Sequence, residues 1–166
     1  MTITPRIHQH QGERRALRAL FELAEDSATQ LDAYLDQGQV LVALLDDQVV
    51  GHLQVVPTAH PERIELKNMA VLPAYQGQGV GRALVESLVE RLADVPVTAL
   101  LVATAAADLD NLRFYQRCGF RFRSVERDAF TAATGYPADI VVDGIALRDR
   151  VWLDLHLPRA RPAATV

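Results

Sequence analysis

Apolar residues recur along this chain with two periods, one typical of helices and the other of strands. Where an apolar position returns after three or four residues, one face of a helix can be buried. This spacing predicts helices over residues 12–26, 27–37, 79–93 and 108–118. Alternating or continuous apolar runs predict strands over residues 39–45, 49–56, 63–72, 97–103 and 120–127.

Turn residues between the predicted strands indicate how some of them pair. Asp46 and Asp47 join the first two strands, which predicts an antiparallel hairpin. Asp143-Gly144, between the stretches 140–142 and 145–157, is the strongest hairpin signal of the chain. Helices and strands gathered around one sheet predict an α/β fold, or equally an α+β sandwich.

Composition excludes several classes of protein. The formal net charge of −4 argues against a nucleic-acid-binding protein, which needs a basic face. One cysteine, Cys118, rules out an intrachain disulfide, and residues 1–10 lack the apolar core of a signal peptide. No apolar stretch has the length of a membrane-spanning helix. We therefore expect a cytoplasmic protein that neither binds nucleic acid nor enters a membrane.

The most informative motif is a glycine-rich loop between a predicted strand and a predicted helix. It reads Gln76-Gly77-Gln78-Gly79-Val80-Gly81. Glycines let the backbone turn sharply and approach a ligand without a Cβ clash. At a helix start, free amides and the positive end of the dipole favour an anion such as a pyrophosphate.

Two other phosphate-binding loops do not fit these residues. A Walker A loop ends in Gly-Lys-Ser/Thr, but the one lysine of the chain is Lys67, upstream of the loop. A Rossmann fingerprint that starts at Gly77 requires a glycine at position 82, where this chain has Arg82.

The loop resembles the Q/R-x-x-G-x-G/A motif of the GNAT superfamily of N-acetyltransferases. Residues 66–73, which precede it, resemble the fourth strand of that family. Residues 111–120, with Asn111, Tyr115 and a Gly-Phe pair, resemble its second cofactor segment. The resemblance covers roughly residues 39–125 and implies a mixed, mostly antiparallel sheet flanked by helices.

The resemblance implies how acetyl-CoA, the acyl donor, is bound. Backbone groups of Met69, Ala70 and Val71 are expected to bond the pantetheine arm as an added strand would. The side chain of Asn111 is expected to contact the same arm. Main-chain amides of one loop are expected to hold the pyrophosphate: Gln76, Gly77, Gln78, Gly79, Val80, Gly81 and Arg82. Arg82 is equally well read as a surface arginine.

The resemblance also implies direct attack of an amine on the thioester, without an acyl-enzyme. Tyr115 is the expected general acid for the leaving thiolate; its alternative role is packing. Glu65 is the candidate base, with a salt bridge to Lys67 as its alternative role. His52 or a chain of waters is the other candidate base. Cys118 is expected to be a small buried residue, since no partner base for a nucleophile stands out.

The acceptor is left open by the sequence. It is expected to be an amine: a small amine, an amino acid, an aminoglycoside-like compound or a protein amine. Glu22, Glu25 and Asp26 either bind a cationic amine or form a solvated helix end. No metal-binding spacing is present, so no metal is expected.

We expect one acyltransferase domain over residues 1–166, with an extension at about 128–157. The extension is expected to help form either the acceptor site or a homodimer contact. A non-catalytic acyl-CoA-binding sensor or regulatory module is the alternative to an enzyme.

Overall fold

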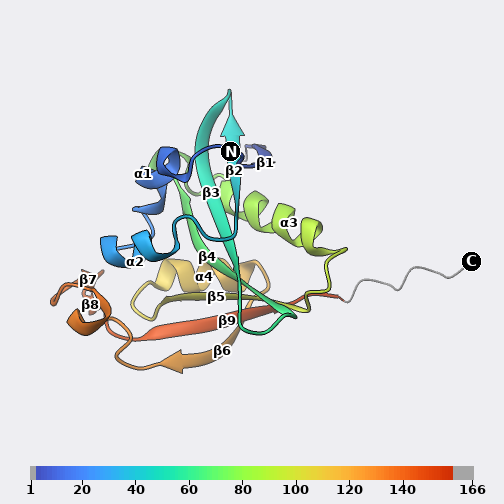
Figure 1. Cartoon of the computed structure of the whole chain (residues 1–166). Coiled ribbons are helices and arrows are strands. Elements are labelled where there is room, and N and C mark those ends of the chain that lie inside the picture. The colour runs from blue at the N-terminus through green and yellow to red at the C-terminus, as the bar shows by residue number, and fades with distance from the viewer. Residues whose placement is uncertain (1–2, 159–166) are drawn as a thin grey trace, which may run out of the picture.

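The computed structural model describes residues 3–158, which form a seven-stranded sheet flanked by helices (Figure 1). The strand order is β1-β2-β3-β4-β5-β9-β6. Only β4 and β5 are paired in parallel within the described chain; the other neighbours are antiparallel. The expected mixed, mostly antiparallel fold is confirmed. The ends of the predicted domain, residues 1–2 and 159–166, lie outside the described residues.

The first half of the sheet contains β1 (Arg6–Gln9), β2 (Gln39–Leu45), β3 (Gln48–Pro57) and β4 (Arg63–Val71). The second half contains β5 (Ala99–Ala105), β9 (Arg150–His156) and β6 (Arg121–Glu126). A separate two-stranded hairpin consists of β7 (Val141–Val142) and β8 (Ile145–Ala146). This hairpin confirms the turn predicted at Asp143-Gly144.

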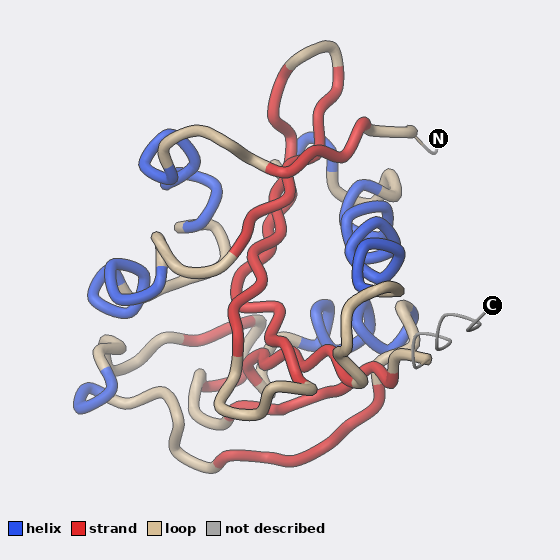
Figure 2. The backbone as a smooth tube through the Cα atoms, turned by 45° about the vertical axis from the view of Figure 1, so that its right-hand side comes forward, coloured by secondary structure: helices blue, strands red, loops and turns tan. Residues whose placement is uncertain are grey.

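Helices cover both faces of β2–β4, as Figure 2 shows for the central strands. On one side lie the 3₁₀-helix η1 (Arg14–Leu17), α1 (Arg18–Phe21) and α2 (Ala28–Tyr34). On the other side lie α3 (Val80–Leu92) and α4 (Leu109–Arg117). Short 3₁₀-helices η2 (Pro73–Tyr75) and η3 (Ala132–Thr134) lie in connecting segments.

Alternation along β2 explains why both faces are covered. Leu41 and Ala43 pack into the apolar cluster that contains the buried face of α3. Val40 and Val42, between and beside them, pack into the cluster formed by α1 and α2. Successive side chains of a strand point to opposite faces, so a strand that is apolar at every position is buried between two layers.

The first predicted helix, residues 12–26, is shorter than its pattern predicts. Helical structure covers only Arg14–Leu17 and Arg18–Phe21. The carbonyl of Phe21 accepts hydrogen bonds from the Ala24 amide at 3.1 Å and from Asn68 Nδ2 at 3.2 Å. The Asn68 side chain of β4 therefore bonds a carbonyl that would accept from the next turn of a continued helix.

The strand predicted over residues 145–157 is interrupted. Its ends form β8 and β9, but residues 147–149 bond to other loops. The Leu147 amide donates to Ile140 O at 2.9 Å, and Arg148 O accepts from the Phe130 amide at 3.1 Å. These bonds join residues of the segment 128–149 to one another, so this part of the chain forms a folded loop instead of a continuous strand.

Candidate active site

A β-bulge in β4 opens the sheet at its centre. Asn68 pairs with Gln54 of β3 and Leu66 pairs with Val55, which leaves Lys67 as the extra residue. The parallel pairing of β4 with β5 ends at the same place, at Leu66 and Val102. Beyond it the two strands diverge (Figure 1).

The bulge matters because it frees one edge of β4. Residues 68–71 still pair with β3, but β5 has turned away. Met69, Ala70 and Val71, the residues expected to bond the donor's pantetheine arm, lie on this segment. A strand edge without a neighbour can receive an extended ligand as an added strand.

The glycine loop lies at the start of α3, as predicted. Gly77 and Gly79 have positive φ angles of 71° and 94°, where a glycine is favoured, and Gly79 is the N-cap residue. Side-chain amides brace the loop: Gln76 Nε2 donates to Val71 O at 3.0 Å, and Gln78 Nε2 donates to Ala74 O at 2.8 Å.

No side chain caps the first amides of α3 in the part of the chain that the structure describes. Gly81, in the first turn, lies against α4; a Cβ there would meet the Phe114 ring at 3.3 Å. Arg82 forms an exposed ion pair with Glu86, Nε to Oε1 at 2.8 Å. The start of α3 thus combines free amides with a close approach of the two helices.

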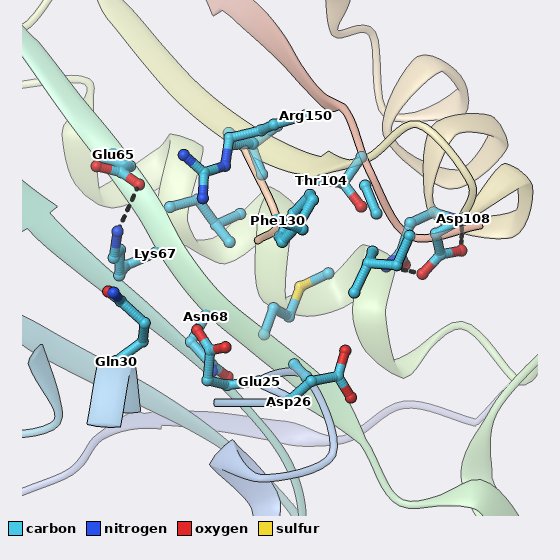
Figure 3. Close-up of a pocket in the computed structure, with 18 of the residues that line it drawn as sticks. Glu25, Asp26, Gln30, Glu65, Lys67, Asn68, Thr104, Asp108, Phe130 and Arg150 are labelled. Carbon is cyan, nitrogen blue, oxygen red and sulfur yellow. Dashed lines mark hydrogen bonds and ion pairs between the residues drawn. The ribbon is translucent and has the colours of Figure 1, made fainter. Parts of the chain in front are cut away.

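A cavity of about 260 Å³ extends from the opening between β4 and β5 to the turn after α1 (Figure 3). Its walls come from α2, β4, β5, α4, β9 and residues 130–147. Glu25 and Asp26 lie on one side of it, and Thr104 and Arg150 on the other. Segments distant in the sequence therefore meet around one space.

Tyr115 and Asn111 of α4 reach this cavity. Tyr115 is buried, with edge-to-face contacts to the rings of Phe114 at 5.2 Å and Phe120 at 5.5 Å. Burial raises the pKa of Tyr115, so its hydroxyl keeps its proton at neutral pH. Asp108 caps α4 and accepts from the Asn111 amide at 2.9 Å and from Asn111 Nδ2 at 2.7 Å.

The sequence model of the acetyltransferase (GNAT) family matches residues 7–120. The chain belongs to this family. A Bacillus subtilis (strain 168) protein named uncharacterized N-acetyltransferase YvbK is 32% identical over 138 residues, covering 83% of this chain and 87% of the relative. The chain is thus an acyl-CoA-dependent N-acyltransferase.

Two solved structures have a similar fold over nearly the whole chain. A Bacillus subtilis acetyltransferase in complex with CoA is similar with a TM-score of 0.84 and 30% identity, covering 93% of this chain and 100% of that one. A GNAT family acetyltransferase from Elizabethkingia anophelis with acetyl-CoA bound has a TM-score of 0.83 and 27% identity, covering 92% and 98% of the two chains.

Within this GNAT fold, Glu65 lines the same cavity as Tyr115. Its Oε1 atom lies 3.3 Å from Nζ of Lys67, and its side chain is 16% exposed. The Lys67 ammonium also lies over the Tyr34 ring, 5.2 Å from the centroid. The salt bridge given above as the alternative role of Glu65 is therefore present, between two residues that line the cavity.

His52, the other candidate base, lies behind the cavity wall. It is fully buried and stacked on Phe21, with ring centroids 4.1 Å apart. Its Nε2 atom is 2.8 Å from Asn68 Oδ1, and Asn68 is the residue that lines the cavity. Burial lowers the pKa of His52 to about 4. His52 can thus influence the cavity only through Asn68.

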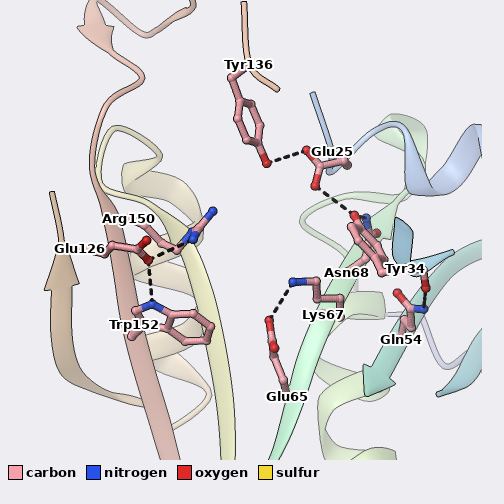
Figure 4. Close-up of polar contacts among 10 residues, drawn as sticks. All are labelled: Glu25, Tyr34, Gln54, Glu65, Lys67, Asn68, Glu126, Tyr136, Arg150 and Trp152. Atoms are coloured by element: carbon pink, nitrogen blue, oxygen red, sulfur yellow. Dashed lines mark hydrogen bonds and ion pairs between the residues drawn. The ribbon is translucent and has the colours of Figure 1, made fainter. Parts of the chain in front are cut away.

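The sequence patterns missed a polar network centred on Glu25 (Figure 4). Glu25 Oε2 accepts from the Tyr34 hydroxyl at 3.1 Å, and Oε1 accepts from the Tyr136 hydroxyl at 2.9 Å and from the Ser27 amide at 3.0 Å. Asn68 Nδ2 donates to the Tyr34 hydroxyl at 2.9 Å. These residues are far apart in the sequence, and no local pattern brings them together.

Buried Gln54 of β3 helps to position Tyr34. Its Nε2 atom donates to the carbonyls of Tyr34 at 2.8 Å and Gln37 at 2.9 Å, at the end of α2. The end of a helix has unpaired carbonyls, so these bonds attach α2 to the sheet. Glu22, by contrast, is exposed and paired with Arg18, Nε to Oε1 at 2.8 Å.

The sulfur of Cys118 is poorly placed to act as a nucleophile. Cys118 is half-buried at the end of α4, and burial raises the pKa of its thiol, which disfavours the thiolate.

Among residues 3–158, no group of three His, Cys, Asp or Glu side chains is placed to hold a metal ion. None of the helices in this range combines the length and apolarity of a membrane span.

Proposed function

We propose that this protein transfers an acetyl group from acetyl-CoA to a primary amine by direct attack in a ternary complex. One observation carries the proposal: where the pairing of β4 with β5 ends, β4 and Tyr115 of α4 line one cavity, and α4 packs through Phe114 against Gly81 at the start of α3. Acyl transfer needs the thioester, the amine and a proton donor close to one another.

The donor would lie along the opening between the strands. Backbone groups of Met69, Ala70 and Val71 bond the pantetheine arm, and main-chain amides from Gln76 to Arg82 hold the pyrophosphate. Asn111 contacts the arm from α4. The free strand edge and the uncapped helix start support this placement.

The reaction then needs three proton transfers. Glu65 takes a proton from the acceptor ammonium, directly or through water, and the neutral nitrogen attacks the thioester carbon. A C–N bond forms as the C–S bond breaks, and the Tyr115 hydroxyl gives its proton to the departing thiolate. The nitrogen of the new amide then loses its remaining extra proton, through water, to the tyrosinate, which restores the Tyr115 hydroxyl. The position of both side chains on one cavity supports these roles.

The segment from about 128 to 157 belongs to the same proposed domain and helps to form its acceptor site. Phe130, Tyr136 and Arg150 of this segment line the cavity. Phe130 and Arg150 lie across the cavity from Glu25 and Asp26 (Figure 3), so the acceptor would enter between these two sides.

The test is incubation of the purified protein with acetyl-CoA and a panel of amines, with release of the CoA thiol and the mass of each amine as readouts. Thiol release matched by an acetylated amine supports the proposal. Binding of acetyl-CoA without acetylation of any amine would favour the non-catalytic sensor. The absence of any thermal shift with CoA or acetyl-CoA would refute both.

A further inference from the structure

Some of the charged side chains that line the cavity have a partner of opposite charge, and others do not. Lys67 is paired with Glu65 at 3.3 Å, and Arg150 is paired with Glu126, Nη1 to Oε2 at 3.0 Å. Glu25 has no cationic partner among the described residues; its three donors are neutral. Asp26 and Asp108 also line the cavity without an ion pair among the described residues, but of these three carboxylates only Glu25 accepts hydrogen bonds from three donors.

The orientation of the network shows that Glu25 is the final acceptor of a chain of hydrogen bonds. The Phe21 carbonyl can only accept, so Asn68 must direct Nδ2 toward it and Oδ1 toward His52. His52 therefore donates to Asn68, Asn68 donates to Tyr34, and Tyr34 donates to Glu25. Bonds that run in one direction polarise one another, here toward the carboxylate.

The two tyrosines are suited to remain donors. Burial raises the pKa of both Tyr34 and Tyr136, so each hydroxyl keeps its proton at neutral pH. Tyr136 is also held edge-to-face against Phe130, with ring centroids 4.9 Å apart. An ionised carboxylate has about four acceptor positions, of which three are filled here. One position is left for a ligand in the cavity.

We propose that Glu25 binds a positively charged group of the acceptor other than the amine that is acetylated. The acceptors are then diamines, polyamines or amines that carry a guanidinium group. This inference rests on the proposed acetyl transfer, because it assigns the acceptor class of that reaction. Of the three acidic residues around the turn after α1, Glu22, Glu25 and Asp26, the proposal assigns cation binding to Glu25.

The bound group must differ from the reacting nitrogen, because that nitrogen has to lose its proton before it attacks. A carboxylate held by three donors is built to keep a cation beside it, whereas the proposed proton acceptor is Glu65. Glu25 thus determines which amines bind, and Glu65 and Tyr115 act on the amine that reacts.

The experiment compares a linear alkyl diamine with the monoamine of the same carbon chain. In the parent protein the diamine has the lower KM. Glu25→Gln should raise the diamine KM by about 10- to 100-fold, as expected for loss of one charged hydrogen bond. The monoamine KM and the affinity for CoA should stay unchanged. Tyr136→Phe, which removes one donor but keeps the charge, should raise the diamine KM less.

Glu22→Gln is the matched control, since Glu22 belongs to the same region but is exposed and paired with Arg18. It should change neither KM. Equal effects of Glu25→Gln on both amines, or no effect on either, would overturn the inference. Thermal unfolding of each variant is measured to confirm that the fold is kept.

Binding to the CoA complex, measured by calorimetry, separates this inference from the proposed reaction. Tighter binding of the diamine than the monoamine, lost in Glu25→Gln, supports the role of Glu25 even if no amine is acetylated. Acetylation of the monoamine and the diamine with the same KM would support the proposed reaction but refute the binding of a second positive group by Glu25.

Discussion

The Nε2 atom of His52 lies 2.8 Å from Oδ1 of Asn68, and this bond fixes the tautomer of a fully buried histidine, which burial keeps neutral. Asn68 Oδ1 can only accept, so the proton is on Nε2. The other ring nitrogen, Nδ1, is buried without a hydrogen-bond partner in the described structure. A second proton on His52 would place a charge in the apolar layer between α1 and β3.

We predict that this histidine makes the fold sensitive to mild acid. Burial lowers the pKa of His52 to about 4, below its ordinary value of about 6.5. Between these values the unfolded chain binds more protons than the folded one. The contribution of neutral His52 to the free energy of unfolding is complete above about pH 6.5. It falls by about 3 kcal/mol as the pH decreases toward about 4.

Urea unfolding measured across this pH range checks the prediction. His52→Gln is the control, because glutamine can donate one N–H to Asn68 but does not titrate in this range. The variant should lose less free energy of unfolding than the parent between neutral and acidic pH. Parallel curves for the two proteins would contradict the assignment.

Tyr115→Phe should lower kcat by about 100-fold or more while leaving the Kd for CoA unchanged. The substitution removes the proposed proton donor but keeps the ring contacts with Phe114 and Phe120. Because the pKa of Tyr115 is raised, loss of its proton should not limit the parent rate until alkaline pH, above about 10. Steady-state kinetics and CoA titration provide the measurement.

Tyr75→Phe is a control for the loss of a hydroxyl, since Tyr75 lies in η2 and its hydroxyl is 3.5 Å from Gln48 Oε1. Its kcat should equal that of the parent. Equal activity of Tyr115→Phe and the parent would remove Tyr115 from the mechanism.

Glu65→Gln should lower kcat/KM by about 100-fold and flatten the acidic limb of the pH–rate profile. Glutamine keeps the size of the side chain but cannot accept the proton of the acceptor. Glu62→Gln, at an exposed position just before β4, should leave the profile unchanged. A Glu65→Gln profile with the parent's acidic limb would assign deprotonation to a chain of waters instead.

Local patterns were sufficient where one segment determines its own structure. The run 39–45 is apolar after Gln39 and forms β2 with the predicted bounds. The apolar face of 79–93 forms α3, and the glycines before it have the positive φ angles that their residue type suggests. β1, a short and largely exposed edge strand, has too few buried positions to show a pattern.

The acceptor side of the cavity depends on pairing between distant segments, which no single segment encodes. The bulge at Lys67 exists because β4 pairs with β3 in two registers. Glu25 meets Tyr136 because the segment 128–149, whose internal hydrogen bonds divide the predicted strand 145–157, lies against the turn after α1. Motifs were therefore sufficient to propose a donor site, whereas the contacts of Glu25 required the three-dimensional structure.

Gly79→Ala should weaken CoA binding about tenfold or more, because the left-handed N-cap of α3 sets the direction of the first helical amides. Gly79 has φ of 94°, and an alanine in that region costs about 1 kcal/mol or more. A small change of this turn moves the amides that are proposed to hold the pyrophosphate.

Gly144→Ala separates backbone strain from ligand binding. Gly144 has a similar φ of 83° and open space around the position of an added Cβ, but it lies in the β7–β8 hairpin. Both variants should lose a similar amount of thermal stability, while only Gly79→Ala should raise the Kd for CoA in a calorimetric titration. If the two variants bind CoA equally well, the start of α3 does not hold the pyrophosphate, and the donor must be bound chiefly along the edge of β4.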